Sequence, residues 1–477
     1  MELKTMQTKK TLAVISLVLL LVACPNPTQS QQAAAPTFSP LYGNFSTDQS
    51  VTIASATTGA TIYYTTDGTD PTTASATYGG PIPVAGDGTS VTLKALAAAS
   101  GMSDSAVTHA YYTIHYAGTL DTGFATGNEA NAAVYPIVLQ SDGKILAAGA
   151  FSTYNSASAV RVVRLNTDGS IDPSFSGTGL GADALVMAMT MHQNGKIIIG
   201  GSFTHFDGTS RGHIARLNAD GGLDTSFAAG SGADSDIFGI AVQNDGKTII
   251  GGLFTMYDGT VRNAIARLNV DGSLDHGFAT GAGPDNWVQA ILLRPDGKII
   301  IGGNFTTYDS VPRECLARLN ADGSLDASFT SGVGGLGDEL YAAAMQKDGK
   351  IIIGGHFSTY SASARGNIAR VNADGSLDST FATGPGATGG DIESIAVNDD
   401  GTILIAGSFT AYDGTSRFRL ARLSSDGSLD TSFPASGTGA SGSLYAVTPQ
   451  ADGRILIGGN FITYNLVPCG YIARIWN

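Results

Sequence analysis

Seven arginines recur at equivalent places in a repeated sequence pattern, each inside a short apolar run. A Leu-Asp or Ile-Asp pair follows six of them, with the aspartate eight residues after the arginine. Arginine offers a rigid fork to a carboxylate, so these residues could bind a charged ligand or form salt bridges that orient the repeats. Their presence in every repeat favours the structural role. The arginines are Arg164, Arg216, Arg267, Arg318, Arg370, Arg422 and Arg474; the aspartates are Asp172, Asp224, Asp275, Asp326, Asp378 and Asp430, with Asp121 as the expected partner of Arg474.

A second group of acidic residues lies in Gly-rich loops that differ from repeat to repeat. Loops held by a rigid scaffold often carry binding residues. If these loops face one side of the molecule, they form an acidic rim with an aromatic platform; ordinary solvated loops are the alternative. The expected rim consists of Glu129, Asp183, Asp236, Asp285, Trp287, Asp338 and Asp391, and Asp234, Glu339 and Glu393 lie in the same loops.

No combination of residues in the sequence indicates a catalytic or metal site. The seven histidines occupy unrelated repeat positions, and none has the i,i+4 partner of a helical metal motif. The stretch Asn218-x-Asp220-Gly221-x-x-Asp224 has calcium-type spacing, but Arg216 occupies the first ligand position, where an anion is needed. We therefore expect no metal, no cofactor and a binding module rather than an enzyme. A pair of loop acids would support the alternative, a glycan-processing enzyme of the cell surface.

Composition indicates a turn-rich all-β protein. Of 477 residues, 63 are glycine, 43% are hydrophobic and only 14% are charged. Glycine supplies the positive φ angles that tight turns require. The net charge of −14 argues against a nucleic-acid partner, because phosphate backbones are repelled. Cationic ligands, neutral sugars and protein surfaces remain open.

The N-terminus has the features of a secretory signal. Lys9 and Lys10 precede the apolar run 11–22, which is short for a membrane span. The run ends in Leu21-Val22-Ala23-Cys24, which resembles the bacterial lipobox. An ordinary signal peptide with an incidental cysteine is the alternative.

The lipobox resemblance implies that residues 1–23 are removed and that Cys24 becomes an acylated N-terminus, which anchors the protein to a membrane. Pro25 follows in place of the Asp that would suggest inner-membrane retention, so the outer membrane is favoured. Residues 24–35 are rich in Pro, Gln, Ala and Ser and are expected to be a tether. The remaining cysteines, Cys315 and Cys469, fall in different repeats, and we expect both to be buried and unpaired.

Residues 36–115 show strand runs separated by turns, at 51–53, 61–65, 91–97 and 109–114. This spacing is typical of a small Ig-like β-sandwich. The stretch Ile62-Tyr63-Tyr64-Thr65-Thr66-Asp67-Gly68-Thr69-Asp70-Pro71-Thr72, with Tyr78-Gly79-Gly80-Pro81-Ile82, resembles the chitobiase/β-hexosaminidase C-terminal domain. That resemblance implies an accessory β-sandwich without catalytic residues. We expect its tyrosines to pack within the sandwich rather than stack on sugars.

Seven repeats fill residues 118–477. A Gly-Gly-x-Phe motif or a near variant places Phe at 151, 203, 254, 305, 357, 409 and 461, and a Leu/Ile-Asp-x-x-Phe motif places Phe at 124, 175, 227, 278, 329, 381 and 433. Each repeat contains four short apolar runs joined in part by Asp-Gly turns, which predicts a four-stranded propeller blade. The motifs resemble the bacterial delta-60 repeat, a propeller-forming repeat, and are similar to kelch blades.

The phase of the repeats predicts a closed ring. The array begins with Leu120-Asp121-x-x-Phe124 and ends with Ile472-Ala473-Arg474-Ile475, two halves that together make one blade. Pairing the first strand with the last would remove the free sheet edges. We therefore expect a monomeric all-β envelope lipoprotein, a β-sandwich followed by a seven-bladed propeller, that binds a surface protein or polysaccharide through its propeller loops.

Overall fold

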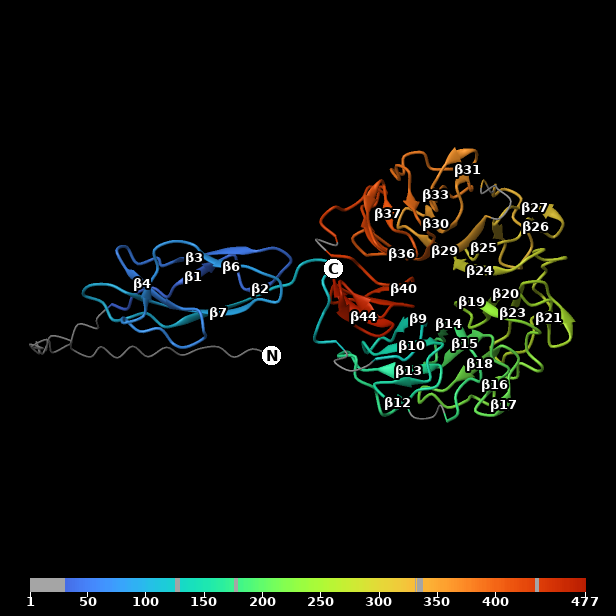
Figure 1. Ribbon diagram of the computed structural model, residues 1–477, viewed down its shortest axis with the longest axis horizontal. Coiled ribbons are helices and arrows are strands. Elements are labelled where there is room, and N and C mark those ends of the chain that lie inside the picture. Colours follow the sequence, from blue (N-terminus) through green and yellow to red (C-terminus); the bar gives the residue numbers. More distant parts are fainter. Residues whose placement is uncertain (1–30, 125–128, 176–178, 331, 333–337, 434–436) are drawn as a thin grey trace, which may run out of the picture. The chain divides into compact units, whose positions relative to one another are not determined.

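The computed structural model describes residues 31–124, 129–175, 179–330, 332, 338–433 and 437–477 (Figure 1). All regular secondary structure among these residues is β-strand. The chain divides into two compact units, Met1–Ile114 and His115–Asn477. Within the described residues, no helix is long and apolar enough to cross a membrane. The expected signal peptide and Cys24 lie outside the described residues.

The first unit is a sandwich of two sheets. One sheet has the order β1-β3-β6, and the other has the order β2-β8-β7-β4-β5, with β2 parallel to β8. The strands are β1 (Thr37–Ser39), β2 (Gly43–Phe45), β3 (Gln49–Ala54), β4 (Thr61–Thr65), β5 (Ala76–Thr77), β6 (Ile82–Val84), β7 (Ser90–Ala98) and β8 (Thr108–Ile114). The four predicted runs are β3, β4, β7 and β8.

Alternating apolar residues of the two sheets form the sandwich core, with Val51, Leu93 and Tyr112 fully buried. The Tyr112 hydroxyl donates to the carbonyl of Pro40 at 2.8 Å. The adjacent tyrosines Tyr63 and Tyr64 are both half-buried, so neither is sealed in the core. The last residues of the expected tether lie along this unit: Ala33 is buried, and its N–H donates to Ser103.

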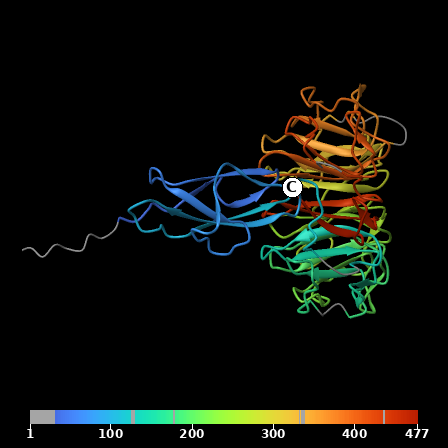
Figure 2. The ribbon, with the colours of Figure 1, turned by 60° about the vertical axis from the view of Figure 1, so that its left-hand side comes forward.

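The second unit is a propeller of seven blades that follow one another in chain order around a ring (Figure 1). Seen from a second direction, the ring is a disc that is thinner than it is wide (Figure 2). Each inner strand lies beside the next, and β40 lies beside β9, which closes the circle. The inner strands are β9 (Val134–Leu139), β14 (Val186–Met191), β19 (Ile237–Val242), β24 (Val288–Leu293), β29 (Glu339–Met345), β35 (Ile392–Val397) and β40 (Leu444–Pro449).

Two further strands of each blade pair antiparallel outside the inner strand. The second strands are β10 (Ile145–Gly149), β15 (Ile197–Gly201), β20 (Thr248–Gly252), β25 (Ile299–Gly303), β30 (Ile351–His356), β36 (Ile403–Gly407) and β41 (Arg454–Gly459). The third strands are β13 (Val162–Leu165), β18 (Ile214–Leu217), β23 (Ile265–Leu268), β28 (Leu316–Leu319), β33 (Ile368–Val371), β39 (Leu420–Leu423) and β44 (Ile472–Trp476). The fourth, outermost strand is the Leu/Ile-Asp segment, which joins the third by a single bridge such as Leu268–Leu274.

A short hairpin leaves each blade between its second and third strands. The hairpins are β11 (Thr153–Tyr154) with β12 (Ala157–Ser158), β16 (His205–Phe206) with β17 (Thr209–Ser210), β21 (Met256–Tyr257) with β22 (Thr260–Val261), β26 (Thr307–Tyr308) with β27 (Val311–Pro312), β31 (Thr359–Tyr360) with β32 (Ser363–Ala364), β37 (Ala411–Tyr412) with β38 (Thr415–Ser416) and β34 (Ala387–Thr388), and β42 (Thr463–Tyr464) with β43 (Val467–Pro468). In six blades a buried hairpin tyrosine bonds the loop to its blade, as where the Tyr257 hydroxyl donates to the Gly272 carbonyl at 2.9 Å; the second blade has the buried Phe206 instead. The repeated Tyr-Asp-Gly sequences are therefore turn architecture.

The ring closes as the repeat phase predicts. Leu120 bridges Ile475 antiparallel, and the backbone N–H groups of Gly118 and Asp121 donate to Trp476 and Arg474. The last blade thus takes its outer strand from the start of the array. The core runs between blades: Ile249 and Ile265 of one blade pack with Val288 and Ile301 of the next.

Candidate functional site

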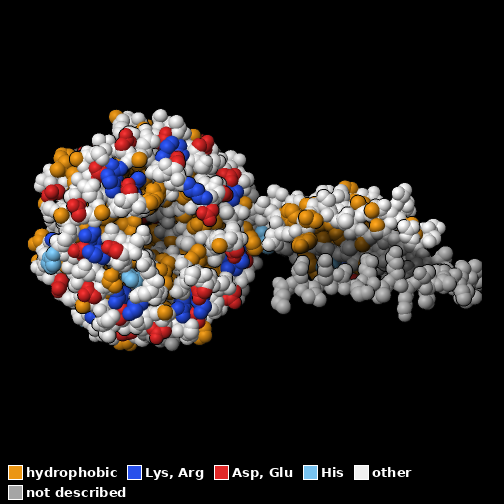
Figure 3. Space-filling model, turned by 180° about the vertical axis from the view of Figure 1, so that it is seen from behind, with side chains coloured by type: hydrophobic (Ala, Val, Ile, Leu, Met, Phe, Trp, Pro, Cys, Tyr) orange, Lys and Arg blue, Asp and Glu red, His pale blue; other side chains and the backbone are white. Residues whose placement is uncertain are grey.

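The repeated arginines and aspartates form one ion pair per blade. Each guanidinium Nε donates to the aspartate Oδ2 at 2.6–2.8 Å, and Arg474 pairs with Asp121 across the closure. A second cation reaches the same carboxylate in six blades, for example Lys298 on Asp326 at 2.6 Å. In the sixth blade the equivalent position is Thr402, and Asp430 has Arg422 alone. Acidic and basic side chains also lie side by side around the ring in the face shown in Figure 3.

Each arginine also connects its blade to the next one. The Arg164 guanidinium donates to the Ala219 carbonyl of the following blade at 2.5 Å, and Arg474 donates to the Thr167 carbonyl of the first blade. The guanidinium carbon lies 4.7–4.9 Å from the ring centre of the Phe in the Leu/Ile-Asp-x-x-Phe motif, within range of a cation–π contact. The guanidinium is thus bound within the fold by the aspartate, the next blade and the Phe ring, which is consistent with the predicted structural role.

The aspartates of these pairs are held in their ionised form. Burial alone would raise the pKa of Asp326, but hydrogen bonds from Lys298, Ser328 and Arg318 hold it well below its ordinary value. Asp224 is held in the same way by Lys196 and Arg216. The stretch with calcium-type spacing therefore has its main carboxylate occupied by two cations.

Several acidic residues of the loops expected to form the rim accept hydrogen bonds within their own blades. Asp183, Asp234 and Asp285 each accept backbone N–H groups from the hairpin of their own blade; Asp285 accepts from Thr306 at 2.7 Å and from Thr307 at 3.0 Å. Their carboxylates cap turns. Short loops leave N–H groups that a nearby carboxylate satisfies, which accounts for these contacts; ligand binding by the rim stays a prediction.

Of the other rim residues, Glu129 is buried and accepts the N–H of Gly470 at 2.9 Å. Asp236 lies 3.6 Å from the Nδ1 atom of His213. Asp338 is also buried, and its backbone carbonyl accepts from the Cys315 thiol. Cys315 and Cys469 are buried and unpaired, as predicted.

A ring of seven side chains surrounds the central channel. Each belongs to the second or third residue of an inner strand, at the point where the ladder to the second strand is interrupted by a β-bulge. In β14, for example, Val186 pairs with Gly201 and Ala188 with Gly200, so Met187 is the additional residue. Bulges re-aim a side chain out of the regular alternation. The ring residues, each 16 positions before the repeated Phe, are Tyr135, Met187, Phe238, Gln289, Tyr341, Glu393 and Tyr445.

The second Gly of the Gly-Gly-x-Phe motif lies opposite the bulge. A Cβ atom on Gly252 would lie 2.0 Å from the Asp236 carbonyl oxygen, and the other six blades show the same approach at 2.0–2.1 Å. Only glycine permits this backbone contact. The repeated glycine thus accompanies the bulge that turns the ring residue into the channel.

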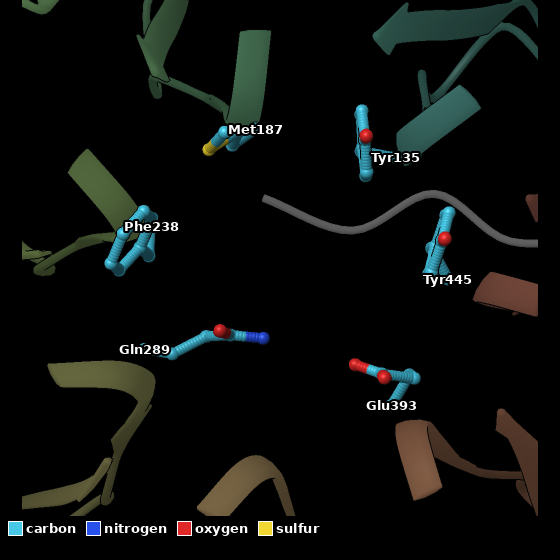
Figure 4. A pocket seen from close by; sticks show the side chains of 6 residues that line it. All are labelled: Tyr135, Met187, Phe238, Gln289, Glu393 and Tyr445. Carbon is cyan, nitrogen blue, oxygen red and sulfur yellow. The ribbon is translucent and has the colours of Figure 1, made fainter. Parts of the chain in front are cut away.

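Six of the ring residues line one pocket of about 270 Å³ (Figure 4). These side chains extend toward its middle from six of the seven inner strands: Tyr135, Met187, Phe238, Gln289, Glu393 and Tyr445. Tyr135 and Tyr445 stack with ring centres 5.0 Å apart. The seventh ring residue, Tyr341, stacks on Trp287 at 6.1 Å, and Trp287 meets the edge of Phe238 at 6.2 Å. The channel opening therefore has an aromatic wall.

Glu393 is the acidic residue of the pocket lining. Burial, together with the nearby negative charges of Asp391 and Glu339, raises the pKa of Glu393 to about 7. These neighbours are themselves engaged. Asp391 lies 2.6 Å from the Nδ1 atom of His356, and Glu339 accepts from Asn304 at 3.3 Å and from the Tyr341 hydroxyl.

Only Trp287 and Glu393 of this site are among the loop residues predicted from the sequence. The other ring residues were not predicted: Tyr135, Met187, Phe238, Gln289, Tyr341 and Tyr445. These lie inside short apolar runs, where strand alternation suggests ordinary core residues. The available signal was variation: residue types change from blade to blade at this position, while the neighbouring positions repeat.

Comparison with known proteins supports the two units. A family model described as "Domain of unknown function (DUF5122) beta-propeller" matches residues 140–175, 192–227, 243–278, 294–329, 346–381, 399–433 and 450–477. The model of the "Chitobiase/beta-hexosaminidase C-terminal domain" matches residues 40–109. The comparison with curated proteins found no significant match.

Several solved structures resemble the chain at low identity. A gluconolactonase from Xanthomonas campestris is 16% identical with a TM-score of 0.36, over 72% of this chain and 95% of that one. An auxiliary nutrient binding protein from Bacteroides ovatus is 11% identical with a TM-score of 0.34, over 80% and 96%. A protein of unknown function from Bacteroides caccae is 12% identical with a TM-score of 0.32, over 56% and 87%.

The seven matched propeller segments together cover more than half of the chain. The chain therefore belongs to the DUF5122 β-propeller family and carries a chitobiase/β-hexosaminidase C-terminal domain that precedes the propeller in the sequence.

Proposed function

We propose that the chain is a ligand-binding module of the bacterial cell envelope and that its propeller takes up the ligand at the channel ring. The observation that carries this proposal is the bulge in every inner strand, which directs seven variable side chains to one place. Positions that serve the fold, such as the Arg–Asp pairs, keep the same residue type in all blades. The ring position has the same backbone geometry in every blade but carries different residue types, as expected of a position that recognises a ligand.

The size and lining of the pocket favour a small ligand or the end of a polymer. Binding pockets are concave, mostly apolar and carry a few polar groups that orient the ligand. Here tyrosine and phenylalanine faces alternate with the Gln289 amide and the Glu393 carboxylate. At about 270 Å³ the pocket holds one sugar unit or one organic molecule of similar size. We therefore propose that recognition takes place inside the channel rather than on the loops.

A panel of soluble glycans, amino acids and amines tests the binding role by thermal shift. Met187→Trp fills the pocket from β14, whereas Met256→Trp places the same bulk on an exposed hairpin. We expect compounds that stabilise the wild-type chain and Met256→Trp but not Met187→Trp. A panel without binders, or binders that Met187→Trp retains, would contradict the proposal.

The envelope location rests on the lipobox-like residues around Cys24. Acylation of Cys24 would tether both units to a membrane, and Pro25 after the cysteine favours the outer membrane. Metabolic labelling of producing bacteria with an alkyne fatty acid tests this. We expect Cys24→Ala to lose the label and to leave the membrane fraction, whereas Cys315→Ala keeps both.

The same pocket bears on the alternative role, a glycan-processing enzyme. Glycoside hydrolysis generally uses two carboxylates that flank the scissile bond. Glu393 has the elevated pKa of a general acid, but Asp391 and Glu339 beside it are held by His356 and Tyr341. Release of reducing sugar from envelope polysaccharides measures this activity, and we expect none above that of Glu393→Gln.

A further inference from the structure

Resting on the binding role proposed above, we propose that the channel pocket selects an organic cation. Its ligand would carry a substituted ammonium group, with Glu393 as counter-charge and Tyr135 and Tyr445 as the aromatic wall. Three features of the pocket support this: an unpaired carboxylate, the lack of a competing cation in the lining and a stacked pair of tyrosines beside it.

Glu393 differs from its acidic neighbours Asp391 and Glu339 in having no partner among the described residues. Within the described residues, its carboxylate has no hydrogen-bond donor and no cation beside it. Asp285 caps a turn, and Asp391 and Glu339 are paired. A partly buried carboxylate without a partner is costly, and a bound cation would supply the missing charge.

The lining of the pocket holds aromatic, thioether and amide groups around this carboxylate and no basic side chain. Tyr135 and Tyr445 stack with an interplanar angle of 21°, and both are half-buried beside the pocket. Aromatic faces attract ammonium groups through their negative quadrupole, and this contact strengthens when the cation is desolvated. The Met187 sulfur adds a polarisable surface. Aromatic walls around one carboxylate are the features that bind alkylated ammonium groups.

A neutral ligand such as a sugar would show the opposite pH dependence. The pKa of Glu393 is about 7, so its carboxyl is about one-tenth ionised at pH 6 and about nine-tenths at pH 8. A cation binds the ionised form, so its affinity rises about tenfold over this range and a proton is released. A sugar that accepts a hydrogen bond from the protonated carboxyl would bind less tightly as the pH rises.

Other titratable groups face Glu393 and belong in the same pH argument. On its own segment the neighbour is Asp391; the adjoining strands contribute the groups Glu339, Tyr341, His356 and Tyr445. The pKa of His356 is raised by its hydrogen bond with Asp391, so His356 loses its positive charge as the pH rises. Loss of this charge makes the region more negative and acts in the same direction as Glu393 ionisation.

Choline and its neutral isostere 3,3-dimethylbutan-1-ol test the proposal, because they differ in charge but hardly in shape. Trp476→Phe leaves Trp287 as the single tryptophan, next to Phe238 and Tyr341, as a fluorescent reporter of the channel. Titrations at pH 6 and pH 8 use this background. The variants are Glu393→Gln, Tyr445→Ala and, as control, Asp399→Asn, an exposed acid just after the far end of β35.

We expect choline to bind about tenfold more tightly at pH 8 than at pH 6 and at least tenfold more tightly than the isostere. Glu393→Gln removes the pH dependence and most of the affinity, Tyr445→Ala weakens binding, and Asp399→Asn changes neither. Equal binding of choline and its isostere, unchanged binding by Glu393→Gln, or no binding of choline overturns the cation proposal. If neutral compounds of the panel still depend on Met187, the binding role stands without the cation; if no compound does, both proposals fail.

Discussion

At the scale of single residues, the acidic side chains fall into two groups. Most are held by partners: Asp326 by Arg318 and Lys298, and Asp285 by backbone N–H groups. Their pKa values lie below the ordinary one, so they stabilise the fold at neutral pH. Glu393 is the opposite case, with a raised pKa and no partner among the described residues. Function-bearing positions commonly reduce stability in this way.

Glu393→Gln should therefore stabilise the ligand-free chain at high pH. The folded-state pKa of about 7 exceeds the ordinary 4.5, so the wild-type fold loses stability as the pH rises through this interval. Glutamine has no charge to desolvate. We expect a gain of roughly 2 kcal/mol at pH 8 that disappears toward pH 4, measured by urea unfolding. Asp399→Asn is the control, and a gain independent of pH would contradict the stated cause.

At the scale of elements, the β-bulge of the inner strand and the second glycine of the Gly-Gly-x-Phe motif occur together in each blade. The first Gly of the motif is Ala148 or Ala406 in two blades, whereas the second is glycine in all seven. The second position requires glycine because a Cβ atom there would lie only about 2 Å from a backbone carbonyl oxygen. The inner strand can then bulge and turn its variable residue into the channel.

Gly252→Ala should destabilise the third blade and displace Phe238. The added methyl would overlap the Asp236 carbonyl, which belongs to the backbone and cannot rotate away. We expect a loss of about 2–3 kcal/mol, with a changed Trp287 emission because Phe238 packs on it. Gly251→Ala, which meets mainly side-chain atoms of Val288 and Ile291, should cost less. Equal losses for the two variants would argue against the bulge explanation.

The hairpin tips offer a second prediction at this scale. Their two turn residues both have positive φ, as type I′ turns require; Gly259 and Leu466 occupy the same turn position at φ 70° and 67°. A left-handed conformation costs a side-chain-bearing residue about 1 kcal/mol. Leu466→Gly should therefore raise, and Gly259→Ala lower, the free energy of unfolding by roughly this amount. Thermal denaturation of the two variants measures it, and the same sign for both would refute the explanation.

At the scale of the whole molecule, closure joins residues more than 300 positions apart. Asp121 accepts from Arg474 at 2.7 Å and from Arg454 at 2.9 Å, and the Tyr464 hydroxyl donates to Gly118. The repeated arginine of each blade donates a hydrogen bond to the following blade. The last blade is therefore connected to the first in the same way as any two neighbours. The closed ring has no free end at which a blade could separate.

Asp121→Ala should weaken the ring more than Asp430→Ala does. Asp121 has two cationic partners and its side chain is 8% exposed, whereas Asp430 has one and its side chain is 26% exposed. Removing one member of a buried ion pair costs about 3–5 kcal/mol, so we expect Asp121→Ala to cost about 3 kcal/mol and Asp430→Ala clearly less. The pKa of Asp121 is lowered, so this stabilisation exists above its ordinary pKa of 3.8 and is lost as the pH falls below it. Chemical denaturation at pH 7 and in acid checks both the ranking and its disappearance.

The sequence by itself determined the number of blades, the Arg–Asp partners, the Asp-Gly turns and the phase that closes the ring. These features repeat within about 50 residues, and local patterns of hydrophobicity and turn chemistry encode them. The tertiary structure alone decided which side chains meet. Closure brings Tyr135 and Tyr445 together from opposite ends of the array. The bulges then turn residues that look like ordinary strand positions into the channel, because an interrupted ladder shifts the alternation of side chains.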